Sequence, residues 1–219
     1  MTNTKSAQSS NIPDAETLEK DPRYRKILEL DFSEMIPFVL SNIRKRGLIP
    51  LFFLGINTIF LFFIILYAVW SVRTGQMNGG KIFWQLLAGI FAGSILVIPP
   101  HELFHGLAYR MLGARNIQFG VDIEQFIFYV TANRFTITKR QLTFLAMTPF
   151  VLINLLVITL TATWASQFTL FSVSLLLCHN IMCIGDFAII SFALSHKGEL
   201  YTYDDTEIKR SYFFEREGL

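Results

Sequence analysis

The sequence predicts an all-α membrane protein with about four transmembrane helices and a short β-hairpin-like insertion between the second and third spans. Hydrophobic residues make up 52% of the 219 residues, and charged residues only 16%. A water-soluble domain of this length could not bury so much apolar surface in one core. Four apolar runs are each long enough to cross a bilayer as a helix, and they cover residues 48–70, 82–98, 142–165 and 168–194.

The distribution of basic residues predicts the orientation of these spans. Eight of the 19 Lys and Arg residues precede the first run and four follow the last, whereas none lies between the third and fourth runs. Because cytoplasmic loops are enriched in Lys and Arg, we expect a multi-pass protein of the cell membrane with both termini in the cytoplasm. The first 31 residues contain no apolar signal-peptide core, so the first span is expected to act as the targeting signal.

The chain is therefore expected to divide into a cytoplasmic N-terminal tail (1–46), a membrane domain (47–195) and a cytoplasmic C-terminal tail (196–219). In the first tail, Asp31 and Glu34 match a capping box ahead of an apolar, helix-periodic stretch. This pattern predicts a helix along the membrane surface, with a simple linker as the alternative.

The insertion is predicted from residues 116–137, where apolar and polar residues alternate as in strands. The alternating apolar residues are Ile117, Phe119, Val121, Ile123, Phe126, Phe128 and Val130, followed by Phe135 and Ile137. We expect two or three short strands on the cytoplasmic side. Thr138 and Gln141 then form a predicted capping box for the third span.

The strongest functional signal is the segment His101-Glu102-Leu103-Phe104-His105 near the cytoplasmic end of the second span. Residues four apart share one face of a helix, so His101 and His105 could bind one metal ion while Glu102 deprotonates a water molecule. The alternative is a pair of polar residues that only pack between helices. The preceding Pro99-Pro100 pair predicts a kink or a restart of the helix.

A catalytic zinc site usually has three protein ligands, and Asp186 is the best candidate for the third. It is the only acidic residue within the third and fourth spans, where an ionisable group is costly unless it is paired or functional. By helical rise, His101 and Asp186 both lie roughly 27–28 Å from the outer ends of their spans. A structural carboxylate bonded between helices is the alternative.

Other polar residues in the spans have weaker functional signals. Asn154 and Asn180 could bind a substrate carbonyl or an oxyanion, although an interhelical hydrogen bond is the favoured interpretation, and Tyr109 is a similar, weaker candidate. His179 lies seven residues before Asp186, about 10 Å along the helix axis, so it is not expected to bind the same ion. A packed, hydrogen-bonded histidine is expected, and a role behind a metal ligand or along a substrate path is the alternative.

The two cysteines, Cys178 and Cys183, are predicted to be buried free thiols. They lie five residues apart, which corresponds to about 140° around a helix. This spacing suits neither a local disulfide nor a shared metal ion.

Together, the His101–His105 motif, Thr148-Pro149 in a later span and Gly185-Asp186 in the last span resemble the bacterial "putative zincin peptidase" family of membrane proteins. That family distantly resembles the site-2 intramembrane zinc metalloproteases. The resemblance covers roughly residues 82–195. It implies zinc ligation by His101, His105 and Asp186 and a catalytic role for Glu102.

These observations predict a membrane-embedded zinc metallopeptidase with Zn²⁺ as cofactor, Glu102 as general base, and a peptide or transmembrane protein substrate within or near the lipid bilayer. The alternative is a non-catalytic membrane protein with a structural or degenerate metal site that binds a partner. A transporter is disfavoured because the spans show no duplicated halves. The net charge of +2 gives no reason to expect nucleic acid as a partner.

Overall fold

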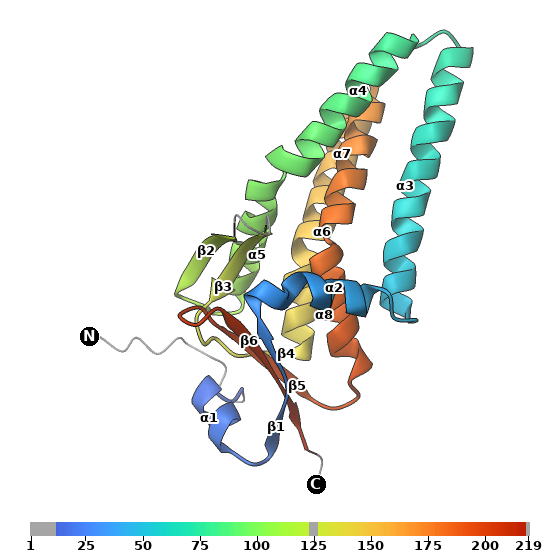
Figure 1. Ribbon diagram of the computed structural model, residues 1–219. Coiled ribbons are helices and arrows are strands. Elements are labelled where there is room, and N and C mark those ends of the chain that lie inside the picture. Colours follow the sequence, from blue (N-terminus) through green and yellow to red (C-terminus); the bar gives the residue numbers. More distant parts are fainter. Residues whose placement is uncertain (1–11, 123–126, 218–219) are drawn as a thin grey trace.

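A computed structural model of the chain describes residues 12–122 and 127–217 (Figure 1). Long helices form one end of the molecule and short strands form the other (Figure 1). The helices are α1 (Ala15–Lys20), α2 (Met35–Ile43), α3 (Leu48–Arg73), α4 (Gly79–Phe91), α5 (Ile98–Met111), α6 (Lys139–Thr163), α7 (Thr169–Met182) and α8 (Ile184–Ser195). The strands are β1 (Tyr24–Asp31), β2 (Ile117–Asp122), β3 (Ile127–Ala132), β4 (Ile137–Thr138), β5 (Leu200–Asp205) and β6 (Arg210–Arg216).

Three helical segments of the described chain are long and apolar enough to span a membrane. They are Leu48–Arg73, Gly79–Leu96 and Lys139–Thr163, with mean hydropathies of 2.5, 1.3 and 2.1. The predicted fourth span is instead a pair of helices, Ser166–Met182 and Ile184–Ser195, that meet at an angle of 46°. The count is therefore three spans, or four if the bent pair crosses as one.

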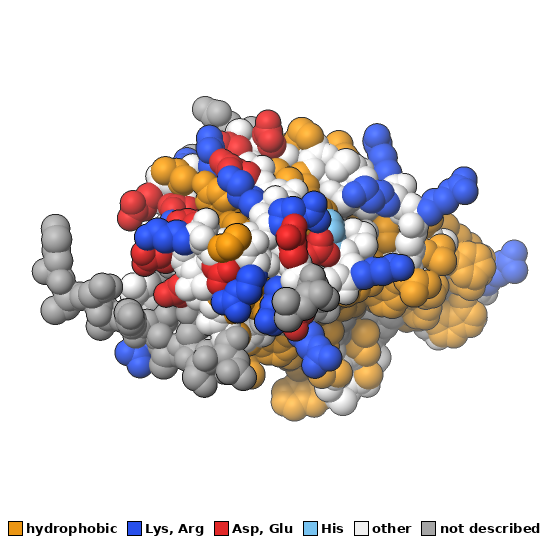
Figure 2. Space-filling view, turned by 90° about the horizontal axis from the view of Figure 1, so that it is seen from below, with side chains coloured by type: hydrophobic (Ala, Val, Ile, Leu, Met, Phe, Trp, Pro, Cys, Tyr) orange, Lys and Arg blue, Asp and Glu red, His pale blue; other side chains and the backbone are white. Residues whose placement is uncertain are grey.

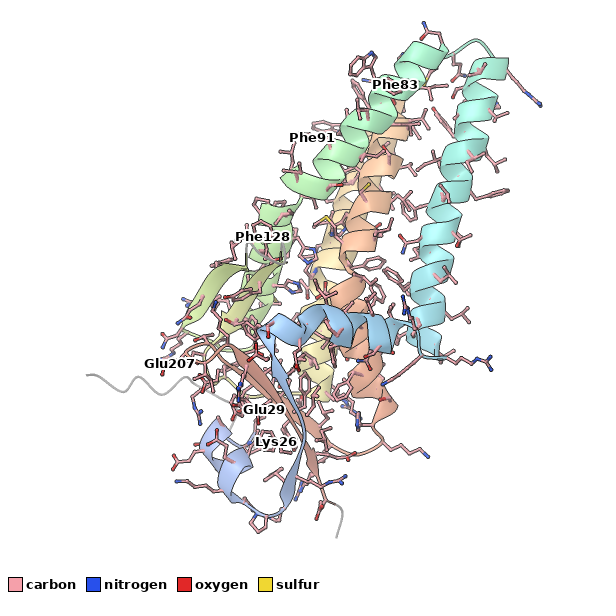
Figure 3. The ribbon with its side chains drawn as sticks, in the orientation of Figure 1. Lys26, Glu29, Phe83, Phe91, Phe128 and Glu207 are labelled. Carbon is pink, nitrogen blue, oxygen red and sulfur yellow. The ribbon has the colours of Figure 1, made fainter. Side chains whose placement is uncertain are left out.

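The outer surfaces of these helices are apolar, as a lipid environment requires. Only 11% of the most apolar stretch of α3 is buried within the protein. On α4, Phe83 and Phe91 point away from the other helices and are 59% and 55% exposed (Figure 3). In contrast, Lys, Arg, Asp and Glu side chains gather on the face seen from below (Figure 2). Apolar surface of this extent would be very costly in water and is suited to a lipid environment.

The predicted interruption at Pro99-Pro100 is confirmed. After α4 the chain forms a π-helical turn, η2 (Ala92–Leu96), and a new helix, α5, begins at Ile98 with the two prolines in its first turn. Proline is tolerated there because the first backbone N–H groups of a helix have no partner within it. Figure 1 shows that α5 leaves α4 in a new direction.

The predicted hairpin between the second and third spans is also present. Strands β2 and β3 pair antiparallel from Ile117 opposite Ala132 to Asp122 opposite Ile127. Ile123 and Phe126 of the predicted alternation lie outside the described residues. The capping box is confirmed, because Thr138 and Gln141 each bond the other's backbone N–H at the start of α6.

The all-α prediction missed a four-stranded antiparallel sheet, in the order β1-β6-β5-β4, built mainly from the segments predicted to be tails. Strand β1 pairs with β6, so a segment that precedes the first span and a segment that follows α8 lie side by side. Several residues of this sheet are charged and form ion pairs between strands, such as Glu29 on β1 with Arg210 on β6. These charges, together with the distance in sequence between the strands, hide the alternating pattern on which a strand prediction depends.

This sheet closes one end of the helix bundle. Leu30 and Phe213 from the sheet share a hydrophobic core with Ala108 of α5, Leu142 of α6 and Phe192 of α8. The Tyr109 hydroxyl, at the end of α5, donates to Asp204 on β5 at 3.5 Å. Burial raises the pKa of the Asp204 carboxyl, while hydrogen bonds from Ser211 and Tyr109 oppose the shift.

Helix α2 follows the sheet and packs on α8, where Phe38 contacts Phe192 with ring centroids 5.5 Å apart. Asp31 caps the short 3-10 turn that precedes α2, accepting from the backbone N–H of Ser33 at 3.0 Å. Ile36 and Leu40 are exposed on its other side. Its position along a membrane surface stays a prediction.

Two glycines, Gly89 on α4 and Gly93 on η2, allow this part of the chain to pack closely on α7. A Cβ atom on Gly89 would lie 2.3 Å from the Phe171 carbonyl oxygen, and one on Gly93 would lie 2.3 Å from the Leu175 carbonyl oxygen. Small residues four apart are typical of close helix contacts in membranes. This contact holds the second span against the helix that precedes Asp186.

We predict that Gly89→Ala lowers the free energy of unfolding by about 1–3 kcal/mol, because the new methyl group has no room between the helices. Denaturation of the detergent-solubilised protein would measure the change. Gly55→Ala on α3 is the control, since a Cβ atom there meets nothing within 4 Å. Equal stability of the two variants would show that α4 and α7 do not pack through Gly89.

Candidate metal centre

The two motif histidines lie on one face of α5, as their spacing predicts. The Nε2 atoms of His101 and His105 are 3.2 Å apart. The two side chains are only 9% and 12% exposed. Two ring nitrogens therefore face the same point in a buried part of the protein.

Asp186 reaches this point from another helix. It lies in the first turn of α8, immediately after the bend at Cys183, and its side chain is 15% exposed. One carboxylate oxygen lies 3.5 Å from His101 Nε2 and the other lies 3.4 Å from His105 Nε2. The three residues predicted from the sequence are therefore brought together.

This group of atoms fits a zinc ion. Bonds of about 2.0–2.2 Å in a tetrahedral arrangement place neighbouring nitrogen and oxygen ligands about 3.3–3.6 Å apart. The distances of 3.2, 3.4 and 3.5 Å within the group agree with this arrangement. Two imidazoles and one carboxylate also form a ligand set typical of catalytic zinc, which leaves the fourth position open.

Hydrogen bonds orient both rings. His105 Nδ1 lies 3.2 Å from the backbone carbonyl oxygen of Leu145 on α6. His101 Nδ1 lies 3.1 Å from Nε2 of His179 on α7. A proton on each Nδ1 leaves each Nε2 with a free lone pair, which is the form that binds a metal ion.

Glu102 lies beside the group and is half-buried. Its Oε2 atom is buried and has no hydrogen-bond partner among the described residues. A buried carboxylate oxygen without a partner is costly, so it points to a polar group that binds there. A water molecule that donates its proton to Glu102 would meet this need.

Comparison with known families supports the interpretation of these residues. A family model described as "putative zincin peptidase" matches residues 94–201. Residues 94–201 are therefore similar to that family. The match contains α5 with its motif, the β2–β3 hairpin and helices α6 to α8. No curated protein and no solved structure matches the chain.

The zincin match implies zinc binding and a metallopeptidase, and the cluster of His101, His105 and Asp186 lies wholly within it. The more distant resemblance to site-2 proteases stays a hypothesis. The strands β1 and β6 and the helix α3 lie outside the matched segment.

The two asparagines predicted as substrate or oxyanion ligands contact each other. Asn154 Nδ2 donates to Asn180 Oδ1 at 2.7 Å and to the Phe150 carbonyl oxygen at 2.8 Å. This is the interhelical bond that the sequence analysis favoured. Both protons of the Asn154 amide are used, whereas Asn180 Nδ2 is buried with no partner among the described residues. Tyr109, the weaker candidate, bonds to the sheet instead.

One contact in this region was not predicted. His179 is not part of the group around Asp186, but its Nε2 atom lies 3.1 Å from His101 Nδ1. His179, His101 and Cys183 form a second group of close ligand atoms, and all three residues are buried. In the sequence, the four-residue spacing of His179 and Cys183 indicates that their side chains share one face of a helix. Both cysteines are free thiols, as predicted, although Cys178 is only partly buried.

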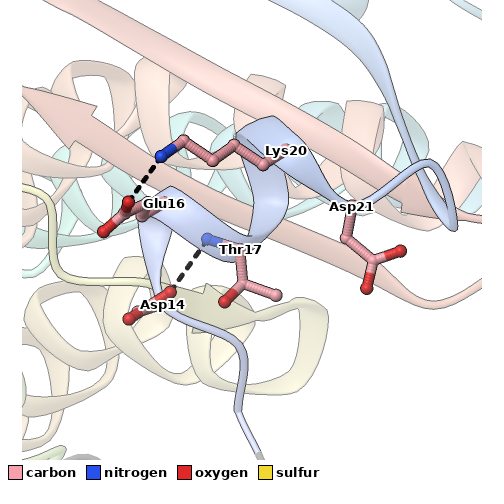
Figure 4. A pocket seen from close by; sticks show the side chains of 5 residues that line it. All are labelled: Asp14, Glu16, Thr17, Lys20 and Asp21. Atoms are coloured by element: carbon pink, nitrogen blue, oxygen red, sulfur yellow. Dashed lines mark hydrogen bonds and ion pairs between the residues drawn. The ribbon is translucent and has the colours of Figure 1, made fainter.

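A shallow surface hollow on α1 lies far from these residues, beyond the sheet (Figures 1 and 4). It is lined by Asp14, Glu16, Thr17, Lys20 and Asp21. Its polar side chains are largely occupied by local contacts, such as the bond from the Thr17 backbone N–H to Asp14 at 2.9 Å and the pair between Lys20 and Glu16 at 2.6 Å. We assign it no chemistry.

We predict about one zinc ion per chain in detergent-purified protein, and its loss in His105→Ala and Asp186→Ala, because each change removes one of three ligands. Metal content by mass spectrometry checks this, with purification free of chelators. His196→Ala is the control, since His196 lies after α8 and bonds to the Phe192 carbonyl oxygen. Full zinc content in the Asp186 variant would remove Asp186 from the site.

Proposed function

We propose that this protein is a membrane-embedded zinc metallopeptidase that hydrolyses peptide bonds of a membrane or membrane-proximal substrate. The observation that carries the proposal is the convergence of His101, His105 and Asp186 beside a buried oxygen of Glu102 that has no hydrogen-bond partner in the described part of the chain. The zincin family match supports the same reaction class. Each of these residues provides a group that peptide hydrolysis needs.

A zinc ion held by these ligands supplies Lewis acidity that polarises the scissile carbonyl and acidifies water. Glu102 accepts a proton from the attacking water molecule and then gives it to the leaving amine. Its burial keeps competing solvent away from the carboxylate. Asn180 is the candidate donor to the substrate carbonyl or the oxyanion, because its amide nitrogen has no partner among the described residues.

The position of the site supports a membrane or membrane-proximal substrate. The motif lies on α5, between the apolar helices and the sheet (Figure 1). Next to His105, Gly106 lies close to the Phe119 ring of the β2–β3 hairpin. The side chains of Phe119, Val121 and Phe128 on this hairpin are exposed. An unwound peptide could therefore lie against apolar side chains as it reaches the metal centre. We propose a peptide or transmembrane protein as substrate.

We also propose a cell-membrane location with both termini in the cytoplasm. Strand β1 precedes the first span and β6 follows the last helix, yet they pair in one sheet. The two ends must therefore lie on one side of the membrane, which requires an even number of crossings. This supports four crossings, with the bent pair of α7 and α8 as the fourth. The abundance of Lys and Arg near both ends favours the cytoplasmic side.

Reporter fusions test this topology. Alkaline phosphatase inserted at Gly75, between α3 and α4, should be active because that loop lies outside the cytoplasm. Green fluorescent protein fused after Leu219 should fluoresce because it folds in the cytoplasm. Fluorescence without phosphatase activity at Gly75 would contradict the four-crossing arrangement.

Glu102→Gln should lower peptide hydrolysis about 100- to 10,000-fold while zinc stays bound, because it removes the general base and leaves the ligands. The measurement is a comparison of new N-termini in membrane proteins of cells that produce the native chain or the variant. Glu207→Gln, an exposed position beyond β5 (Figure 3), is the control.

Cleavage that persists in the Glu102→Gln variant would rule out Glu102 as the base. Zinc binding without any cleavage by the native chain would favour the alternative, a non-catalytic protein that binds a partner around a structural metal site.

A further inference from the structure

His101 is contacted on both ring nitrogens. Its Nε2 faces His105 and Asp186 in the metal centre, while its Nδ1 lies 3.1 Å from His179 Nε2. His179 is fully buried on α7, and its ring centroid lies 5.3 Å from that of His101. The imidazole of His101 thus lies between the metal centre and a second histidine.

His179 and Asp186 lie on either side of the break between α7 and α8. His179 lies one turn before Cys183 and Asp186 lies just after it, and the helices change direction there by 46°. This broken helix presents an imidazole to one nitrogen of His101 and a carboxylate to the other.

The tautomer of His101 follows from its role as a ligand. A neutral imidazole that binds zinc through Nε2 carries its proton on Nδ1, and that proton needs an acceptor. Within the described chain, the acceptor at this position is His179 Nε2, which lies 3.1 Å from His101 Nδ1. His179 must then be neutral, with its own proton on its Nδ1 atom, which is buried and has no hydrogen-bond partner among the described residues.

We infer that His179 is a positioning residue, whose Nε2 accepts the Nδ1 proton of His101 and so holds the metal-binding tautomer and orientation of that ring. The inference rests on the proposed function only in that His101 binds the metal ion. The two motif histidines are thus held differently, since His105 donates to the Leu145 backbone carbonyl, which no side-chain substitution removes.

The same atoms raise a rival possibility, a second metal ion held by His101, His179 and Cys183. The Cys183 sulfur lies 3.6 Å from His179 Nε2, a distance that would suit two ligands of one ion. However, a neutral His101 that binds one ion through Nε2 has no lone pair at Nδ1 for another. Filling both sites would require a doubly deprotonated His101, so the hydrogen bond is favoured.

The test is the zinc affinity of the full chain in detergent, measured by competition with a chelating fluorescent indicator. His179→Leu removes the acceptor and should weaken zinc binding about 10- to 100-fold. His179→Gln places an amide oxygen near the position of Nε2 and should stay within a few-fold of the native affinity. Cys183→Ala should keep one zinc ion with near-native affinity.

The inference would be overturned if the zinc affinity of His179→Leu stayed within twofold of the native affinity. It would also be overturned if His179→Gln lost as much zinc affinity as His179→Leu. Two zinc ions per native chain that fall to one in Cys183→Ala would replace it with the second metal site. An absence of zinc from the native chain would contradict the proposed function as well. Tight zinc binding by the native chain, with the same affinity in His179→Leu, would contradict the positioning role alone.

A second measurement covers the case in which His179→Leu does not fold. In the zinc-loaded native chain labelled with ¹⁵N-histidine, His101 should carry its proton on Nδ1, with its resonance assigned by comparison with His179→Gln. An unprotonated His101 Nδ1 would overturn the positioning role.

Discussion

The contact between His101, His105 and Asp186 is the interaction on which the arrangement of the helices depends. Ionisable side chains among apolar helices are costly unless they pair or bind an ion. Here the carboxylate lies within 3.5 Å of both imidazoles, and the outer nitrogens of the rings also have partners. The cost of burial is offset only if four separate helices, α5, α6, α7 and α8, keep these positions.

Two interruptions in neighbouring helices provide the required geometry. The π-helical turn before Ile98 lets α5 start anew with its prolines, and the break at Cys183 redirects α8. Both interruptions lie close to the ligands. π-Helical turns and broken membrane helices are frequent at functional sites, where irregular backbone lines a polar interior. The packing of α4 and η2 on α7 through Gly89 and Gly93 keeps the two interrupted helices in contact.

The sheet fixes the other end of these helices. Its residues share one hydrophobic core with α5, α6 and α8, and the bond from Tyr109 to Asp204 lies one turn beyond His105. Because β1 and β6 come from opposite ends of the chain, the sheet also holds the N-terminal and C-terminal segments together. The segments predicted as tails therefore support the helices that carry the metal centre.

The sequence alone determined the apolar spans, the motif helix, its interruption at the prolines and the hairpin, because each depends on residues close together in the chain. It also identified Asp186, since a single carboxylate in an apolar span is conspicuous. The tertiary structure alone decided the contact of His179 with His101 and the pairing of β1 with β6. Each of these contacts joins residues far apart in sequence. His101 and His179 are separated by 78 residues, so no local sequence pattern predicts that they meet.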